Sequence, residues 1–381
     1  MGMNNSINAG RFDRGGADRW ARGAGLPLIG KRMPKPKRIM LQGDSIPTGY
    51  MSAYPSGNTA AQLTSPTAAM KRALIGAGFQ VQDEFFEGTM GYTTAASFAS
   101  FDPRVVFGAG WEFNGIVAAN YGVLRNSTNQ NECSFTPASQ CDSATLIFRS
   151  HALTGSVSAS LGSIVKTLSI PATYGFYRID FAPSDGVTLA VNVLKWNRQA
   201  SGGTVDLAAA YCWNSKLPSF QILNASASGA RAMHIARGDD AGRSLFFPEQ
   251  ILSAGDECWW MVGPNDWREN ALPAMSEFKA YAEAWADRRL ANGIVPRIIL
   301  NARTALTAGT ATIEHMDDYS AALREVAAAR SISVHDVKDR WGEYADALAA
   351  GLMVGGTDYF HPNWAGAQDL GQFYAQIAMA A

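Results

Sequence analysis

The fold is decided by the stretch Lys37-Arg38-Ile39-Met40-Leu41-Gln42-Gly43-Asp44-Ser45. Its short apolar run is typical of a buried strand, because such runs bounded by turn residues fill the interior of a sheet. Gly43 permits a tight turn out of that strand, since glycine lacks a Cβ atom. Ser45 is therefore predicted at the carboxyl end of a strand, where open α/β sheets place their chemistry.

A serine hydroxyl at that position becomes a nucleophile only when a base removes its proton. The segment Asp358-Tyr359-Phe360-His361-Pro362 supplies a histidine and a carboxylate three residues apart. In a turn, the carboxylate of Asp358 can accept a hydrogen bond from one imidazole nitrogen of His361, while the other nitrogen faces the serine. This spacing predicts that Ser45, His361 and Asp358 form one hydrolytic site.

A third motif, Gly263-Pro264-Asn265-Asp266, follows a second buried-strand candidate at residues 256–262. We expect the side-chain amide of Asn265 to lie beside the backbone N–H of Ser45, where both would donate to a developing oxyanion. Asp44 and Asp266 adjoin these positions. We expect their carboxylates to hold the loops through backbone N–H groups and not to transfer protons.

Together these motifs resemble the SGNH, or GDSL-type, serine hydrolases, a family of esterases with a flavodoxin-like three-layer α/β/α fold and a parallel sheet. The resemblance covers residues 37 to about 100 and about 228 to 381. It implies that Ser45 is the nucleophile, that Asp358 and His361 complete a catalytic triad, and that Asn265 is an oxyanion donor. It implies no cofactor and no metal.

The family's remaining motif is a glycine whose N–H completes the oxyanion hole, and two positions compete for it. Gly91 closes a glycine pair after the apolar run at residues 85–86, followed by an aromatic residue and threonine. Gly229 follows the strand candidate at residues 220–224, and its distance upstream of Gly263 favours it. Both alternatives stay open in the sequence.

The middle of the chain has a different pattern. Residues 103–227 contain short β-like runs separated by Gly, Ser, Asn and Pro, which favours an inserted β-sandwich resembling carbohydrate-binding domains. The flanking segments, 37–102 and 228–381, show helical spacing at 67–77, 273–291 and 316–329, with strands at 296–300 and 331–335. If the insert is self-contained, the flanks should close into one sheet without it; alternatively, the strand candidate at residues 220–228 belongs to the hydrolase sheet and the insert ends near residue 219. Residues 1–36 are interpreted as an N-terminal extension or linker.

Composition narrows the classes of partner. The 32 Lys and Arg residues balance the 33 Asp and Glu residues, which argues against a nucleic-acid partner. No apolar run reaches the length of a transmembrane helix, so membrane insertion is not expected. Cys133 and Cys141 would pair as a disulfide in an oxidising compartment or stay free in a reducing one. The cysteine and histidine spacings match no metal site.

The inserted sandwich and the family resemblance together indicate the class of substrate. We expect a carbohydrate O-acetylesterase that deacetylates a polysaccharide or peptidoglycan, with the acetylated glycan as its partner. A lipid or small-ester esterase and a non-catalytic glycan-binding structural protein are the alternatives. No Sec signal peptide is apparent. A bacterial-surface substrate then predicts a phage tail or virion component, and a cytoplasmic protein is the alternative.

Overall fold

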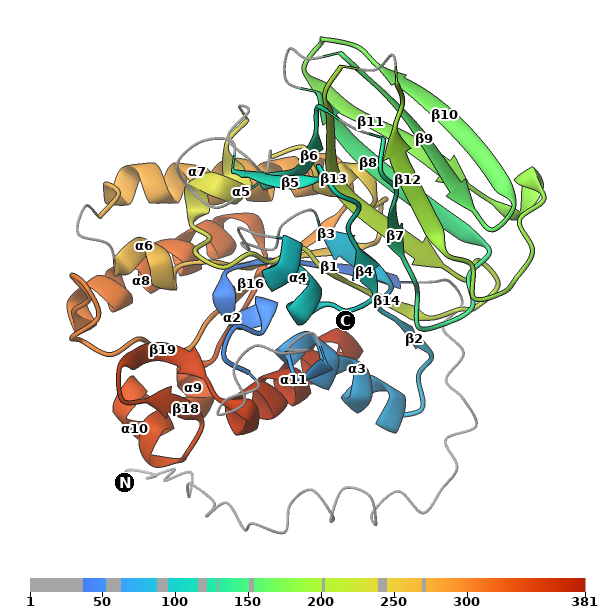
Figure 1. Cartoon of the computed structure of the whole chain (residues 1–381). Helices are drawn as coiled ribbons and strands as arrows, with labels where there is room; N and C mark the ends of the chain where they lie inside the picture. Colours follow the sequence, from blue (N-terminus) through green and yellow to red (C-terminus); the bar gives the residue numbers. More distant parts are fainter. Residues whose placement is uncertain are drawn as a thin grey trace, which may run out of the picture.

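Six parallel strands form the central sheet, in the order β17-β16-β15-β1-β14-β2 (Figure 1). The computed structural model describes residues 37–52, 63–87, 95–115, 122–128, 130–150, 154–200, 203–238, 245–268 and 272–380. The strands are β1 (Lys37–Gly43), β2 (Val81–Gln82), β14 (Phe220–Asn224), β15 (Glu257–Met261), β16 (Val295–Leu300) and β17 (Ser333–Asp336). The parallel sheet predicted from the sequence is confirmed.

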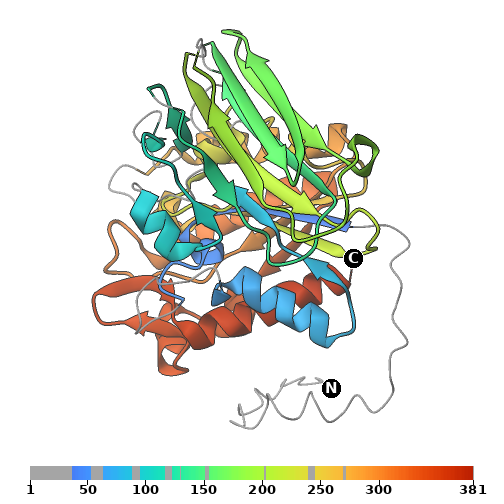
Figure 2. The same cartoon turned by 45° about the vertical axis from the view of Figure 1, so that its right-hand side comes forward.

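Helices cover both faces of this sheet, because alternate side chains of each strand point to opposite faces. On one face, α3 (Pro66–Gly76) and α11 (Trp364–Met379) lie side by side and pack against residues such as Ile39 and Leu41 (Figure 2). On the other face, α7 (Met275–Ala291) and α8 (Ile313–Arg330) pack against Met40 and its neighbours. The result is the three-layer α/β/α arrangement.

Short elements complete this part of the chain. They are α2 (Ser45–Thr48), α5 (Ala232–Ala236), the 3-10 helix η3 (Pro248–Gln250), α6 (Pro264–Trp267), α9 (Lys338–Trp341) and α10 (Tyr344–Ala349). A two-stranded antiparallel sheet of β18 (Met353–Gly355) and β19 (Asp358–Pro362) precedes α11. Since α2 and α6 directly follow β1 and β15, they lie at the carboxyl edge of the parallel sheet.

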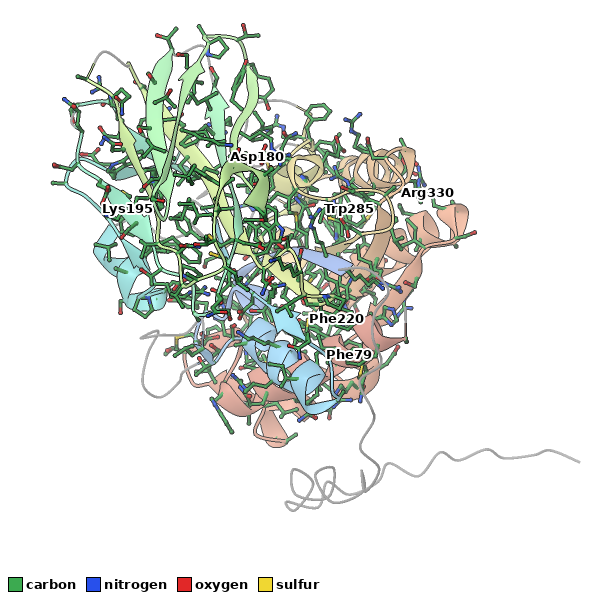
Figure 3. The ribbon with its side chains drawn as sticks, turned by 90° about the vertical axis from the view of Figure 1, so that its right-hand side faces the viewer. Phe79, Asp180, Lys195, Phe220, Trp285 and Arg330 are labelled. Atoms are coloured by element: carbon green, nitrogen blue, oxygen red, sulfur yellow. The ribbon has the colours of Figure 1, made fainter. Side chains whose placement is uncertain are left out.

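Two antiparallel sheets form the β-sandwich at the top of Figure 1, in the orders β10-β9-β12-β7-β4 and β11-β8-β13-β6-β5. The strands are β4 (Val105–Val106), β5 (Glu112–Gly115), β6 (Gly122–Asn126), β7 (Cys133–Phe135), β8 (Ser143–Ser150), β9 (Gly155–Leu161), β10 (Ile164–Ile170), β11 (Gly175–Phe181), β12 (Leu194–Arg198) and β13 (Val205–Trp213), and the 3-10 helix η2 (Pro183–Asp185) follows β11. Figure 3 labels one residue of each sheet, Asp180 on β11 and Lys195 on β12.

The membership of these sheets corrects the boundaries expected at 102/103 and 227/228. Strand β3 (Phe85–Glu87) pairs with β13, and Phe98 of α4 (Ala95–Phe101) is buried in the sandwich core. Strand β14 pairs with β1 along its whole length and belongs to the parallel sheet. The sandwich therefore runs from β3 to β13. Composition misplaced the second boundary because β14 is an apolar run like the sandwich strands that precede it.

The sandwich also closes the hydrophobic core of the parallel sheet. Ile147 on β8 and Ala209 on β13 pack in the same cluster as Met40 and Leu223 of the sheet. All eight residues of β8 are buried; Leu146 packs in the sandwich core, and Ile147 packs in the core shared with the parallel sheet. The sandwich therefore shares a core with the parallel sheet and is not self-contained.

The four cysteines are buried and free, so Cys133 and Cys141 are not joined by a disulfide. Instead, the Sγ atom of Cys141 lies 3.7 Å from the carbonyl oxygen of Asn192. Within the described ranges, no helix has both the length and the apolar character needed to cross a membrane.

Candidate active site

The three predicted side chains meet at the carboxyl edge of the sheet. The Nε2 atom of His361 lies 2.8 Å from Oγ of Ser45, and its Nδ1 atom lies 2.8 Å from Oδ2 of Asp358. Both spacings are those of hydrogen bonds. The structure therefore brings together a hydroxyl, an imidazole and a carboxylate in a continuous hydrogen-bonded chain.

The turn after β1 places Ser45 in this chain. A Cβ atom on Gly43 would lie 2.3 Å from Cγ of Pro47, so only glycine fits where the strand turns into α2. Asp44 is the N-cap of α2, and its carboxylate accepts a hydrogen bond of 2.9 Å from the backbone N–H of Ile46. These contacts fix the serine at the first position of a helix that is only one turn long.

A turn in β19 holds the other two side chains. Oδ1 of Asp358 accepts hydrogen bonds from the backbone N–H groups of Phe360, at 3.1 Å, and of His361, at 2.8 Å. The imidazole ring lies between two aromatic rings, with centroid distances of 4.0 Å to Phe360 and 4.7 Å to Tyr50. His361 is only 3% exposed, so its orientation is set by packing as well as by hydrogen bonds.

Burial and pairing set the charges of this pair. Burial lowers the pKa of His361 below its usual 6.5, although the hydrogen bond to Asp358 opposes this shift. Burial raises the pKa of Asp358, but its hydrogen bonds to His361 and to the backbone outweigh burial and hold that pKa below 3.8. At neutral pH the imidazole is therefore neutral and the carboxylate is charged, which is the state that a general base requires.

Asn265 lies in α6, next to the loop that follows β14. Its Nδ2 atom donates a hydrogen bond of 3.0 Å to the carbonyl oxygen of Ala230, which leaves the second N–H of the amide for another acceptor. The carboxylate of Asp266 accepts from the backbone N–H of Ala232 at 3.1 and 3.2 Å. Both carboxylates expected to hold loops, Asp44 and Asp266, thus bind backbone N–H groups.

One of the two candidate glycines lies in this same loop. Gly229 has φ +84°, a conformation open to glycine, and stands between Ala227 and Ala230. The backbone N–H of Ala227 donates to the carbonyl oxygen of Gly43 at 2.9 Å, so the loop lies against the turn that carries the serine. Gly91, the alternative, lies outside the described residues.

Two nearby residues were not predicted. The Nδ2 atom of Asn301 donates to the carbonyl oxygen of Met261 at 2.5 Å and lies 3.4 Å from both carboxylate oxygens of Asp44. In the sequence, only the position of Asn301 directly after the strand β16 could have indicated that it lies at the site. Arg268, two positions after Asp266, carries its guanidinium carbon 4.2 Å from the ring centroid of Phe360. Its nearness to the third motif was its only signal.

Burial also raises the pKa of Asp44, to about 7, against the lowering effects of the Ile46 N–H, Asn301 and Arg268. A carboxyl group with such a pKa is only partly charged at neutral pH. In the structure its carboxylate accepts hydrogen bonds from the Ile46 N–H and from Asn301, which marks it as a structural cap.

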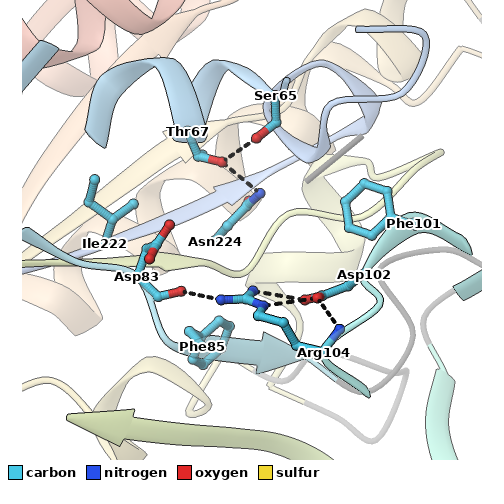
Figure 4. Close-up of a pocket in the computed structure, with 9 residues that line it drawn as sticks. All are labelled: Ser65, Thr67, Asp83, Phe85, Phe101, Asp102, Arg104, Ile222 and Asn224. Atoms are coloured by element: carbon cyan, nitrogen blue, oxygen red, sulfur yellow. Dashed lines mark hydrogen bonds and ion pairs between the residues drawn. The ribbon is translucent and has the colours of Figure 1, made fainter. Parts of the chain in front are cut away.

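A separate hollow lies where the sandwich meets the parallel sheet (Figure 4). Arg104 crosses it, with hydrogen bonds to the carboxylate of Asp102 and to the carbonyl oxygen of Asp83. Asn224, also in its wall, donates to the carbonyl oxygen of Pro47 at 3.0 Å, which links the hollow to α2. The hollow is lined by Ser65, Thr67, Asp83, Phe85, Phe101, Asp102, Arg104, Ile222 and Asn224, so the three side chains of the hydrogen-bonded chain lie outside it.

Comparison with known proteins defines the class of this fold. No protein-family model and no curated protein sequence matches the chain. Among solved structures, a peptidoglycan O-acetylesterase is similar at 11% sequence identity and a TM-score of 0.55, over 91% of each chain. A family two carbohydrate esterase from Cellvibrio japonicus is similar at 9% identity and a TM-score of 0.31, over 73% of this chain and 95% of that chain. An acetyl xylan esterase is similar at 16% identity and a TM-score of 0.33, over 42% and 80%.

The chain therefore has an SGNH, or GDSL-type, hydrolase fold. The likeness to the peptidoglycan O-acetylesterase extends over the parallel sheet and the sandwich together, because it spans nine-tenths of both chains. At this level of identity the likeness defines the fold, and the chemistry has to be argued from the residues of this chain.

Proposed function

We propose that this protein is a serine esterase that removes O-acetyl groups from a polymeric glycan, a polysaccharide or peptidoglycan. The observation that carries the proposal is the hydrogen-bonded chain from Ser45 through His361 to Asp358. Esterase chemistry needs a nucleophile, a base and a group that orients the base, and these three side chains supply them at hydrogen-bonding distance.

In the proposed reaction, Oγ of Ser45 attacks the carbonyl carbon of the acetyl group and gives its proton to Nε2 of His361. Asp358 stabilises the resulting imidazolium without taking its proton. The free N–H of the Asn265 amide and the backbone N–H of Ser45, together with that of Gly229 or Gly91, donate to the oxyanion. His361 then protonates the departing sugar oxygen. Water hydrolyses the acetyl-serine in the second half of the reaction and releases acetate.

Two observations support a glycan as the substrate. The segment that carries His361 also presents aromatic side chains to solvent, with Tyr359 37% and Trp364 55% exposed. Flat aromatic faces offer apolar surface that sugar rings can cover. In addition, a solved structure that is similar over both parts of this chain is a peptidoglycan O-acetylesterase. Such a substrate suits a protein that acts at the bacterial surface, for example a phage virion component.

The deciding experiment is acetate release from a panel of acetylated polysaccharides and peptidoglycan, with the Ser45→Ala variant as the control. Acetate release from a polymer by the wild type, absent from the variant, is the expected result. A parallel series of p-nitrophenyl esters from acetyl to octanoyl distinguishes the alternatives. A preference for octanoyl would instead favour a lipid esterase, and no turnover of any ester would favour a non-catalytic glycan-binding protein.

A further inference from the structure

A positive charge lies beside the hydrogen-bonded chain and is not used by the chemistry described above. The guanidinium carbon of Arg268 lies 4.2 Å from the ring centroid of Phe360, and that ring lies 4.0 Å from the ring of His361. Arg268 is close enough to both His361 and Asp44 to lower their pKa values through its charge. The guanidinium of Arg268 therefore lies close enough to the imidazole of His361 for one substituted sugar to contact both.

Within the described residues, the guanidinium of Arg268 has no carboxylate partner and no hydrogen-bond acceptor, and its Nε atom is buried. Arg340, by contrast, donates two hydrogen bonds of 2.6 Å to Asp369. The nearby carboxylates are already engaged, since Asp358 binds His361 and Asp44 caps α2. A half-buried cation without an anion is costly, so this position favours an anion that comes from outside the chain.

The local geometry suits a carboxylate. The backbone of Arg268 is fixed, because its carbonyl oxygen accepts a hydrogen bond of 3.0 Å from the N–H of Thr310. Phe360 takes one face of the guanidinium plane, as in cation–π pairs. The two Nη groups, unlike the buried Nε, stay available, and their forked arrangement matches the two oxygens of a carboxylate.

We propose that Arg268 binds a carboxylate of the substrate, so that the preferred ester is an acetyl group on a glycan with an acidic sugar at or next to the acetylated position. This inference rests on the proposed esterase function and narrows its substrate class. Arg268 would then determine specificity by holding the sugar whose acetyl group Ser45 attacks.

The test compares two small esters that differ only in charge: the methyl glycoside of an acetylated glucuronic acid, and that of glucose acetylated at the same hydroxyl. We expect the full-length wild type to favour the acidic ester in kcat/KM. In Arg268→Gln the ratio of the two kcat/KM values should fall by about 10- to 100-fold, the usual worth of a hydrogen-bonded charge pair. Arg268→Lys keeps the charge but loses the fork, so its ratio should be intermediate.

Arg330→Gln is the matched control. It removes the same charge from the end of α8, at the edge of the molecule, where the arginine pairs with Asp287 (Figure 3). Its ratio should equal that of the wild type. Should Arg268→Gln fail to fold, the wild type still provides a measurement, because added salt should weaken its preference for the acidic ester.

Two outcomes would overturn the inference and leave the esterase standing: equal use of both esters by the wild type, or a loss in Arg268→Gln that is the same for both. Equal losses would mean that Arg268 acts on the reacting groups or on the fold. Failure of the wild type to hydrolyse p-nitrophenyl acetate or either sugar ester would overturn the proposed function itself, so the two failures are distinguishable.

Discussion

The Nε2 atom of His361 lies 2.8 Å from the Oγ atom of Ser45, although 316 positions separate the two residues in the chain. Each residue is held by its own short turn: Ser45 follows the Asp44 cap, and His361 follows the loop closed by Asp358. Because both turns are local, the packing of α2 and β19 at the sheet edge suffices to align them. The alignment makes definite kinetic predictions.

Ser45→Ala should reduce kcat by at least about a thousandfold on p-nitrophenyl acetate, because alanine has no hydroxyl group to form the acyl intermediate. His361→Ala should lose a similar factor. Since the two residues act as a unit, the double variant should lose little more than either single variant. Independent, multiplying losses, in proteins shown to be folded by circular dichroism, would contradict a triad.

Asn265→Ala tests the oxyanion hole. Loss of one donor typically lowers kcat by about 100- to 1,000-fold with little change in KM. The variant also removes the hydrogen bond to the carbonyl oxygen of Ala230, so its free energy of unfolding has to be measured beside its kinetics. Asn265→Asp keeps the shape of the side chain but replaces the donor, and should be at least as inactive. A rise in KM alone would assign Asn265 to substrate binding.

The rate should depend on pH through His361. Burial lowers the pKa of this residue below 6.5, and the base works only when neutral. The value of kcat/KM should therefore stay constant as pH falls from 8 to the usual histidine pKa, and decrease only below it. An acidic limb with its midpoint above 6.5 would show that a different group controls the rate. The same pH profile measured on Asp44→Asn is the control. Asp44 has a pKa of about 7, so an acidic limb caused by this residue would be absent from the variant.

Asp44 should also make stability depend on pH. Burial raises its pKa in the folded protein from 3.8 to about 7. The contribution of protonated Asp44 to the free energy of unfolding is therefore fully present below about pH 4 and is lost as pH rises through 7. Asp44→Asn removes this titration while its side-chain oxygen can still accept from the Ile46 N–H. At pH 8 the variant should be more stable than the wild type by on the order of a few kcal/mol. Urea unfolding at pH 4.5 should show a much smaller difference, and an equal difference at both pH values would contradict the raised pKa.

Much of the site was predictable because its geometry is local. The strand at 37–43 and the carboxylate three residues before His361 are fixed by a few neighbouring residues, and the sequence indicates both. The contacts of Asn301 and Arg268 depend on how distant loops converge at the sheet edge. No periodicity or motif in this chain reports that convergence, so neither residue was predicted.

The predicted domain boundaries were wrong for a different physical reason. A strand such as β14, buried in a parallel sheet, and a strand such as β8, buried on both faces in a sandwich, are both short apolar runs. Composition cannot tell them apart, because burial on two sides removes the alternation that marks a half-exposed strand. Pairing partners decide the assignment, and these lie far away in the sequence.

The shared strands predict how the protein unfolds. Leu146 and Ile147 are neighbours on β8 whose side chains point to opposite faces; Leu146 lies in the sandwich core, and Ile147 lies in the core shared with Met40 and Leu223 of the parallel sheet. Truncation to alanine should cost about 2 to 5 kcal/mol at either position. Since β8 belongs to both cores, we expect one cooperative unfolding transition. Both variants should lower the midpoint of that transition.

Calorimetry and urea titrations followed by two spectroscopic probes would check this. Two separate transitions, with Leu146→Ala lowering the midpoint of only one, would mean that the sandwich unfolds independently.

The same argument predicts that replacing residues 85–213 with a Gly/Ser linker fails to give a soluble esterase. The deletion would remove Ile147 and Ala209 from the core that they share with Met40 and Leu223, and would expose the apolar surface that they cover. A folded deletion variant that still hydrolyses p-nitrophenyl acetate would show that the helices alone can close that face of the sheet.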